Sequence, residues 1–111
     1  MSWRATGLAA ATLLPGAMRE VLAGSTSVLV VRAAGELRAV EGVCPHQGGL
    51  LVDGNLSGTR VTCPVHEAAF DVTDGRVLAD PHGSEPPEGA VGPLSTYPVR
   101  IRDGMVEVDV P

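Results

Sequence analysis

The 111-residue chain has few aromatic side chains, few basic ones and very little cysteine. It contains one Trp, one Tyr, one Phe and two Cys, with 8 Lys and Arg residues against 13 Asp and Glu. The formal charge of −5 argues against nucleic acid as a partner, because phosphate binding needs a surplus of basic side chains. No apolar run approaches the roughly 20 residues that a membrane-spanning helix needs. We therefore expect neither nucleic acid nor a membrane as a partner.

The composition is otherwise that of a folded globular protein, with 44% hydrophobic and 19% charged residues. A chain of this length commonly forms one core, so we expect residues 1–111 to be a single domain without room for a separate catalytic domain. The apolar stretch at residues 7–17 only loosely resembles a secretory signal, because Pro15 and Gly16 interrupt it. We expect a cytoplasmic protein, in which reduced cysteines stay free to bind a metal.

Short runs rich in Val and Leu alternate with turn residues, a pattern typical of antiparallel strands. The Asp103-Gly104 pair between two such runs is the strongest short signal for a hairpin. Residues 80–93 are rich in proline and glycine and predict an irregular surface loop. One short helical turn is expected within residues 8–14. The predicted strands cover residues 2–6, 18–23, 27–32, 36–41, 60–63, 68–72, 76–79, 97–102 and 105–110.

Both cysteines and two of the three histidines lie in two similar segments, VCPHQGG and TCPVHEAAFD. Each segment can supply one thiolate and one imidazole, so the two could close on a metal from two sides. A proline after each cysteine stiffens the chain, and Gly48 and Gly49 permit positive φ and a close approach of the backbone to a cofactor. The candidate ligands are Cys44 and His46 in the first segment and, after sixteen intervening residues, Cys63 and His66 in the second.

Three interpretations of this pattern compete. The first is a chance pairing of buried cysteines and surface histidines. The second is a structural Cys₂His₂ zinc site, although zinc fingers usually pair Cys with Cys and His with His along the chain. The third is a two-iron cluster, which suits mixed segments if both thiolates bind one iron and both imidazoles bind the other.

The two segments resemble the Rieske [2Fe–2S] proteins, in which C-x-H and C-x-x-H are separated by a spacer of about this length. The resemblance includes the glycine pair, the Phe70-Asp71 continuation and the closing stretch TYPVRIRDGMVEVDV, and it covers about residues 2–111. It implies an all-β Rieske fold, in which an antiparallel β-sandwich base carries a loop-rich cluster-binding subdomain at one tip. The insert would occupy about residues 42–82.

This resemblance implies one [2Fe–2S] cluster as the cofactor. Cys44 and Cys63 would bind one iron, and His46 and His66 the other, more exposed iron. Because imidazoles are neutral ligands, the iron that they bind is the expected site of the added electron. His82, in the proline-rich loop, is expected to be exposed and not a ligand.

The family includes high-potential respiratory subunits and low-potential soluble ferredoxins. The respiratory proteins have an additional disulfide at positions that match Gly49 and Val65, and hydroxyl donors to the sulfurs at positions that match Ala68 and Phe70. Neither the disulfide nor the hydroxyl donors can form with the residues of this chain. The resemblance therefore implies a soluble, low-potential ferredoxin.

Such ferredoxins are electron carriers and not enzymes. They shuttle electrons from an NAD(P)H-dependent flavin reductase to a terminal oxygenase, most often one that hydroxylates aromatic rings. We expect these two partners and a monomeric carrier. The alternative is the small subunit of an assimilatory NAD(P)H nitrite reductase, which has the same fold, and a structural zinc module is a further alternative.

One residue departs from the family pattern beside the expected cluster. Relatives usually have glycine after the second histidine ligand, whereas this chain has Glu67. If the backbone needs a positive φ there, a side chain costs roughly 1–2 kcal/mol. The carboxylate also adds negative charge beside the expected cluster.

Overall fold

The structure is a computed structural model that describes residues 2–45, 49–65, 67–79 and 92–111. Within these residues the chain forms antiparallel strands in three sheets, which confirms the predicted all-β fold. Two single-turn 3₁₀ helices accompany them, η1 (Ala10–Thr12) and η2 (Leu51–Asp53). The first of these is the short turn predicted within residues 8–14. Most of the predicted 80–93 loop lies outside the described residues.

One three-stranded sheet contains both ends of the described chain. Its order is β1 (Ser2–Ala9), β11 (Met105–Val110) and β10 (Val99–Arg102). Asp103 and Gly104 connect β10 to β11 with φ values of 52° and 79°. Positive φ at both central residues is the geometry that a two-residue hairpin loop requires, so the predicted Asp-Gly hairpin is confirmed.

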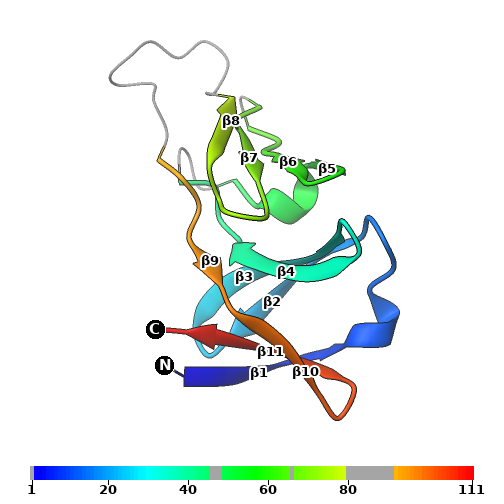
Figure 1. Cartoon of the computed structure of the whole chain (residues 1–111). Helices are drawn as coiled ribbons and strands as arrows, with labels where there is room; N and C mark the ends of the chain where they lie inside the picture. Colours follow the sequence, from blue (N-terminus) through cyan, green and yellow to red (C-terminus); the bar gives the residue numbers. More distant parts are fainter. Residues whose placement is uncertain (1, 46–48, 66, 80–91) are drawn as a thin grey trace.

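A second, four-stranded sheet packs against the first (Figure 1). Its order is β2 (Met18–Ala23), β3 (Thr26–Ala33), β4 (Glu36–Glu41) and β9 (Thr96–Tyr97). The predicted strand at 97–102 is therefore wrong as one unit, because it is divided at Pro98 between β9 and β10. Proline has no N–H to donate to a neighbouring strand, and here it marks the crossing from one sheet to the other.

The insert contains a third sheet, and three of its four strands match those predicted at 60–63, 68–72 and 76–79. Its order is β5 (Asn55–Ser57), β6 (Arg60–Thr62), β7 (Ala69–Asp71) and β8 (Val77–Ala79). The strand β5 was not predicted, since it has a single apolar residue, Leu56, between Asn55 and Ser57, and asparagine is uncommon in strands. Figure 1 shows this small sheet at the opposite end of the molecule from the two chain termini.

The strand β3 lies between two hydrophobic cores. Leu29 and Val31 face the small sheet, whereas Val28 and Val30 face the sheet of β1, β11 and β10. Successive side chains of a strand point to opposite sides, so a strand that is covered on both faces must be apolar throughout. All four of these side chains are fully buried.

The apolar stretch that loosely resembled a signal belongs to the folded base. Leu8, Ala10 and Leu13 are buried in the second core. The Arg32 guanidinium holds the stretch in place by donating from Nε to the Leu13 carbonyl at 2.6 Å and from Nη2 to the Ala10 carbonyl at 3.0 Å. No helix in the described part of the chain has the length and apolar character needed to cross a membrane.

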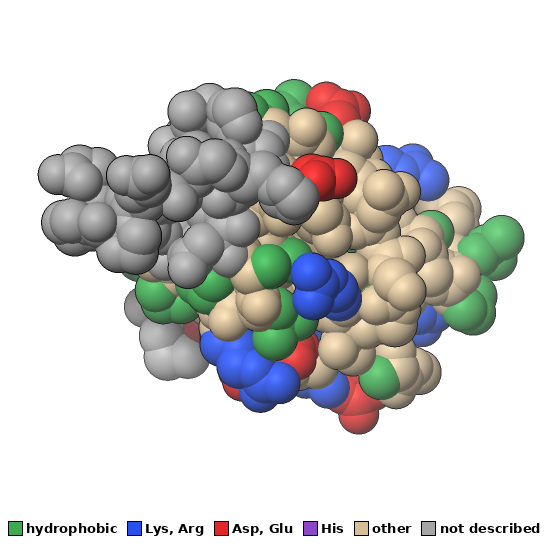
Figure 2. All heavy atoms as spheres, turned by 90° about the horizontal axis from the view of Figure 1, so that it is seen from above, with side chains coloured by type: hydrophobic (Ala, Val, Ile, Leu, Met, Phe, Trp, Pro, Cys, Tyr) green, Lys and Arg blue, Asp and Glu red, His purple; other side chains and the backbone are tan. Residues whose placement is uncertain are grey.

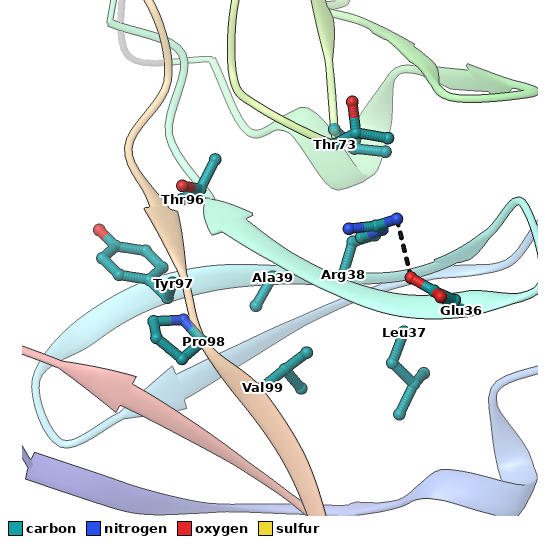
Figure 3. Close-up of a pocket in the computed structure, with 10 residues that line it drawn as sticks. Glu36, Leu37, Arg38, Ala39, Thr73, Thr96, Tyr97, Pro98 and Val99 are labelled. Atoms are coloured by element: carbon teal, nitrogen blue, oxygen red, sulfur yellow. Dashed lines mark ion pairs between the residues drawn. The ribbon is translucent and has the colours of Figure 1, made fainter.

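A polar cavity of about 400 Å³ separates β4 from the turn that follows β7. Figure 3 shows Arg38 on β4 in this gap, paired with Glu36 and lying below Thr73. The Arg38 Nη2 lies 2.8 Å from the Glu36 Oε2, and the buried Arg38 Nε has no hydrogen-bond partner among the described residues. The base and the small sheet therefore meet here across polar groups, beside the apolar core that joins them.

Asp71 organises the turn between β7 and β8. Its Oδ1 accepts hydrogen bonds from the Thr73 N–H at 2.9 Å and the Thr73 hydroxyl at 2.6 Å, and Arg76 lies 3.3 Å from its Oδ2. The Thr73 hydroxyl and N–H, assisted by the Arg76 charge, lower the pKa of Asp71 although burial acts to raise it. The turn is thus stabilised by an ionised carboxylate.

We predict that Asp71→Asn destabilises the protein at neutral pH and has a smaller effect in acid. Because the folded-state pKa of Asp71 lies below the unfolded value of about 3.9, its stabilisation is complete above that pH and is lost as the pH falls through the folded-state pKa. Thermal unfolding of both proteins from about pH 7 to about pH 3 would show whether the stability of the wild type falls toward that of Asp71→Asn. The exposed Asp103→Asn serves as control, and a difference for Asp71→Asn that stays constant down to about pH 3 would contradict this explanation.

Candidate metal centre

The two cysteine segments are closed by equivalent backbone hydrogen bonds. The Cys44 N–H donates to the Gly49 carbonyl at 2.8 Å, and the Cys63 N–H donates to the Ala68 carbonyl at 2.7 Å. In each case the acceptor lies five residues after the cysteine. The first loop follows β4 and the second connects β6 to β7, so each cysteine is held where a strand ends.

The two cysteine side chains lie together inside the protein. Both are 1% exposed, both belong to the core that contains Leu29 and Val31, and they do not form a disulfide. Burial raises the pKa of the Cys63 thiol; the N–H of Val65 opposes this shift, and a hydrogen bond and charge interaction with Cys44 add to it. Two buried thiolates this close repel each other, and a bound metal cation would compensate their charge.

The backbone of both loops lies close to the Cys63 sulfur. The Val65 N–H donates to the Cys63 Sγ at 3.4 Å. A Cβ added to Gly49 would lie 2.9 Å from the Val65 Cγ2 and 3.2 Å from the Cys63 Sγ. Gly49 does not have a positive φ, so glycine is needed here for the space beside Val65 and the Cys63 sulfur and not for its backbone conformation.

The sulfur half of the predicted ligand set therefore fits a metal site. Among the described residues there is no group of three or more His, Cys, Asp and Glu side chains arranged around a metal. The predicted ligands His46 and His66 lie outside the described residues, as do Gly48 and His82. What the structure brings together is Cys44, Cys63 and the backbone around them.

The positions that distinguish respiratory relatives also lie at the sulfurs. A Cβ at Gly49 would be 3.5 Å from the Val65 Cβ, which is a normal separation for a disulfide, but neither residue is cysteine. Ala68 and Phe70 are fully buried in the same core as the cysteines and supply no hydroxyl. The role of Val65 as a hydrogen-bond donor could not be predicted from the sequence, because every residue except proline has a backbone N–H.

Glu67 has a left-handed backbone conformation, at a position where relatives usually have glycine. Its φ is 61°, and its side chain is exposed. The condition set out from the sequence is thus met, and the side chain costs roughly 1–2 kcal/mol at this position. Figure 2 looks down on the end of the molecule with the small sheet, and on the described surface there the acidic and basic side chains are scattered.

These features define a small all-β protein with a two-loop thiolate metal site. The sequence profile of the Rieske [2Fe-2S] domain family matches residues 4–98. The chain therefore belongs to the Rieske family and carries a single [2Fe–2S] cluster.

Comparison with known proteins adds three informative relatives. The ferredoxin component of a naphthalene 1,2-dioxygenase system from Pseudomonas putida is 28% identical over 93% of this chain and 91% of its own. A structure described as the complex of reduced oxygenase and oxidised ferredoxin in carbazole 1,9a-dioxygenase matches with a TM-score of 0.75 and 30% identity, covering 96% of this chain and 91% of that one. A putative NADH-dependent nitrite reductase small subunit from Mycobacterium tuberculosis matches with a TM-score of 0.76 and 28% identity, covering 99% and 96%.

We predict that Gly49→Ala weakens the metal site. The added methyl group would crowd Val65 and the Cys63 sulfur, and such overpacking costs roughly 1–3 kcal/mol. Iron content and the thermal unfolding midpoint should both fall, the midpoint by roughly 4–8 °C for each kcal/mol. Gly92→Ala is the matched control, since a Cβ there meets no atom of the described residues within 4 Å. Equal iron content and equal midpoints for the two variants would contradict the proposed crowding.

Proposed function

We propose that this protein carries single electrons from an NAD(P)H-dependent flavin reductase to the terminal oxygenase of an aromatic-ring-hydroxylating system. The observation that carries the proposal is the similarity to a dioxygenase ferredoxin component over more than nine-tenths of both chains, in a chain that has both cysteine loops. A protein of this kind transfers electrons and leaves the chemistry on the substrate to its partner. The similarity to a ferredoxin in a structure with its oxygenase supports an oxygenase as that partner.

The proposed ligands are Cys44 and Cys63 on one iron and His46 and His66 on the other. When bound, the cluster supplies reversible one-electron redox chemistry. The buried, adjacent sulfurs of the two cysteines support their part of this assignment. The Val65 N–H stabilises negative charge on the Cys63 sulfur.

The residues around the sulfurs favour a low reduction potential. Hydrogen-bond donors to sulfur stabilise the reduced state, and neither Ala68 nor Phe70 can donate from its side chain. Both are fully buried beside the cysteines, so water does not take the place of the missing hydroxyl groups. The carboxylate of Glu67 acts in the same direction by disfavouring additional negative charge nearby.

We further propose that residues 1–111 act as one domain and one monomeric carrier in the cytoplasm, with the cluster-binding insert at about 42–82. A shared hydrophobic core supports the single domain, because Leu29 and Val40 of the base pack in one core with Val61 and Phe70 of the insert. A domain boundary would normally fall where few contacts cross.

The second candidate is the small subunit of a nitrite reductase. The match to such a subunit over nearly the whole of both chains favours it. The ferredoxin role is preferred because relatives that match over most of both chains are ferredoxin components of dioxygenase systems.

We predict that the purified protein binds two irons and two acid-labile sulfides per chain, as one [2Fe–2S] cluster requires. His46→Ala and His66→Ala should lose the cluster, whereas His82→Ala, the matched control, should keep it. Iron and sulfide analysis with the visible spectrum would measure this. A colourless protein with one zinc would contradict the assignment.

The same variants test the function. The holoprotein should restore NAD(P)H-dependent product formation to a dioxygenase reductase and oxygenase that lack their own ferredoxin. His82→Ala should do so equally well, and His46→Ala should not. Transfer to a nitrite reductase catalytic subunit, with none to any dioxygenase, would favour the second candidate.

We also predict an order of reduction potentials. The wild type should be lowest, Glu67→Gly somewhat higher, and Ala68→Ser and Phe70→Tyr highest, because these two add a hydroxyl beside the sulfurs. Protein-film voltammetry at one pH would measure the series. A wild-type potential well above about 0 mV, in a family that spans roughly −150 to +300 mV, would contradict the low-potential assignment.

A further inference from the structure

A second cavity lies in the base of the protein, apart from the cysteine loops. It has a volume of about 530 Å³ and is formed by β9, the chain on either side of β9 and the end of β11. Figure 3 shows Tyr97 and Pro98 on the side of β9 that faces away from Arg38. The lining residues are Ser95, Thr96, Tyr97, Pro98, Asp109 and Pro111.

The cavity contains a buried carboxylate with little compensation. Asp109 is 5% exposed, and its Oδ1 accepts a hydrogen bond from the Ser2 N–H at 2.7 Å. Within the described part of the chain this is the only hydrogen bond of the carboxylate, and no basic side chain pairs with it. Burying a carboxylate is costly unless a cation or several donors compensate it, so this site favours a positively charged ligand.

The other walls suit a cation on an apolar stem. The Tyr97 ring and the rings of Pro98 and Pro111 provide apolar surface, and an aromatic face attracts an ammonium or guanidinium group. A second carboxylate, that of Glu41, accepts from the Ser95 N–H at 2.8 Å. Burial and the charge of Glu41 together raise the pKa of Tyr97, and the Glu41 carboxylate contributes negative potential beside the cavity.

None of the ion pairs formed by arginines in the described residues involves Asp109. The sequence contains no lysine, and all eight basic residues are arginines. Arg100, on β10 of the same sheet as Asp109, lies 4.1 Å from the centre of the Trp3 ring and 2.8 Å from the Glu107 carboxylate. It is therefore engaged elsewhere on the sheet.

We propose that this cavity is a docking site for a lysine or arginine side chain of a partner protein. The cationic group pairs with Asp109, and the methylene stem lies against Tyr97 and Pro98. A partner held in this way contacts the base and leaves the cysteine loops accessible. The proposal does not depend on which redox partners the protein serves.

The test uses Nα-acetyl-lysine methylamide as a probe of the oxidised holoprotein. Amide chemical shifts of Tyr97, Asp109 and Val110 should move in a saturable way during titration. Asp109→Asn, which keeps an acceptor for the Ser2 N–H, should weaken binding roughly ten- to hundredfold, as expected for a charged hydrogen bond. The matched control is Asp103→Asn, an exposed acid on the hairpin that leads into β11, and it should bind the probe like the wild type.

The alternatives give distinct results. Equal binding of Nα-acetyl-norleucine methylamide would identify an apolar groove and overturn the proposal, as would equal binding by Asp109→Asn or no shifts at all. The arginine analogue shows which cation is preferred, and binding of either analogue supports the proposal. If Asp109→Asn does not fold, Tyr97→Leu tests the same site, since loss of the aromatic face should also weaken binding of the lysine probe.

Discussion

The metal centre depends on two backbone hydrogen bonds of equal span. Each joins the N–H of a cysteine to the carbonyl five residues later, Cys44 to Gly49 and Cys63 to Ala68. These closures turn two separate segments into similar loops whose sulfurs lie side by side. Without them the thiols would have no fixed position, and a metal would have to order both loops at the cost of its own binding free energy.

The loops in turn depend on the strand at the centre of the molecule. Because β3 is apolar on both faces, it joins the base core to the core that contains the cysteines. The sulfurs therefore lie in a packed, buried environment, where a single N–H such as that of Val65 has a larger electrostatic effect than it would in water. The same core thus holds the cysteine loops in place and strengthens the effect of nearby donors on the sulfurs.

The sequence allowed much of this to be predicted, for identifiable reasons. The strands at 18–23, 36–41 and 105–110 were predicted residue for residue, because alternating runs end at turn residues such as Gly35 and Gly104. The cysteine segments were evident since they contain all the cysteine in the chain. The small sheet was only partly anticipated, because β5 has one apolar residue between two polar ones and is recognisable only by its pairing with β6. The base cavity was not anticipated, because its walls come from residues 95–98 and from the distant Asp109.

The sequence by itself determined the residue types that bind a metal, the turns and the apolar strands, since these follow from local chemistry and periodicity. Only the tertiary structure decided that Gly49 is needed for space and not for its φ, that the backbone of Val65 faces a sulfur, and that Pro98 passes the chain from one sheet to the other. It also decided that Asp109 is a buried carboxylate at a cavity. The physical reason is that each of these depends on contacts between segments distant in sequence, and residue type alone does not encode which segments meet.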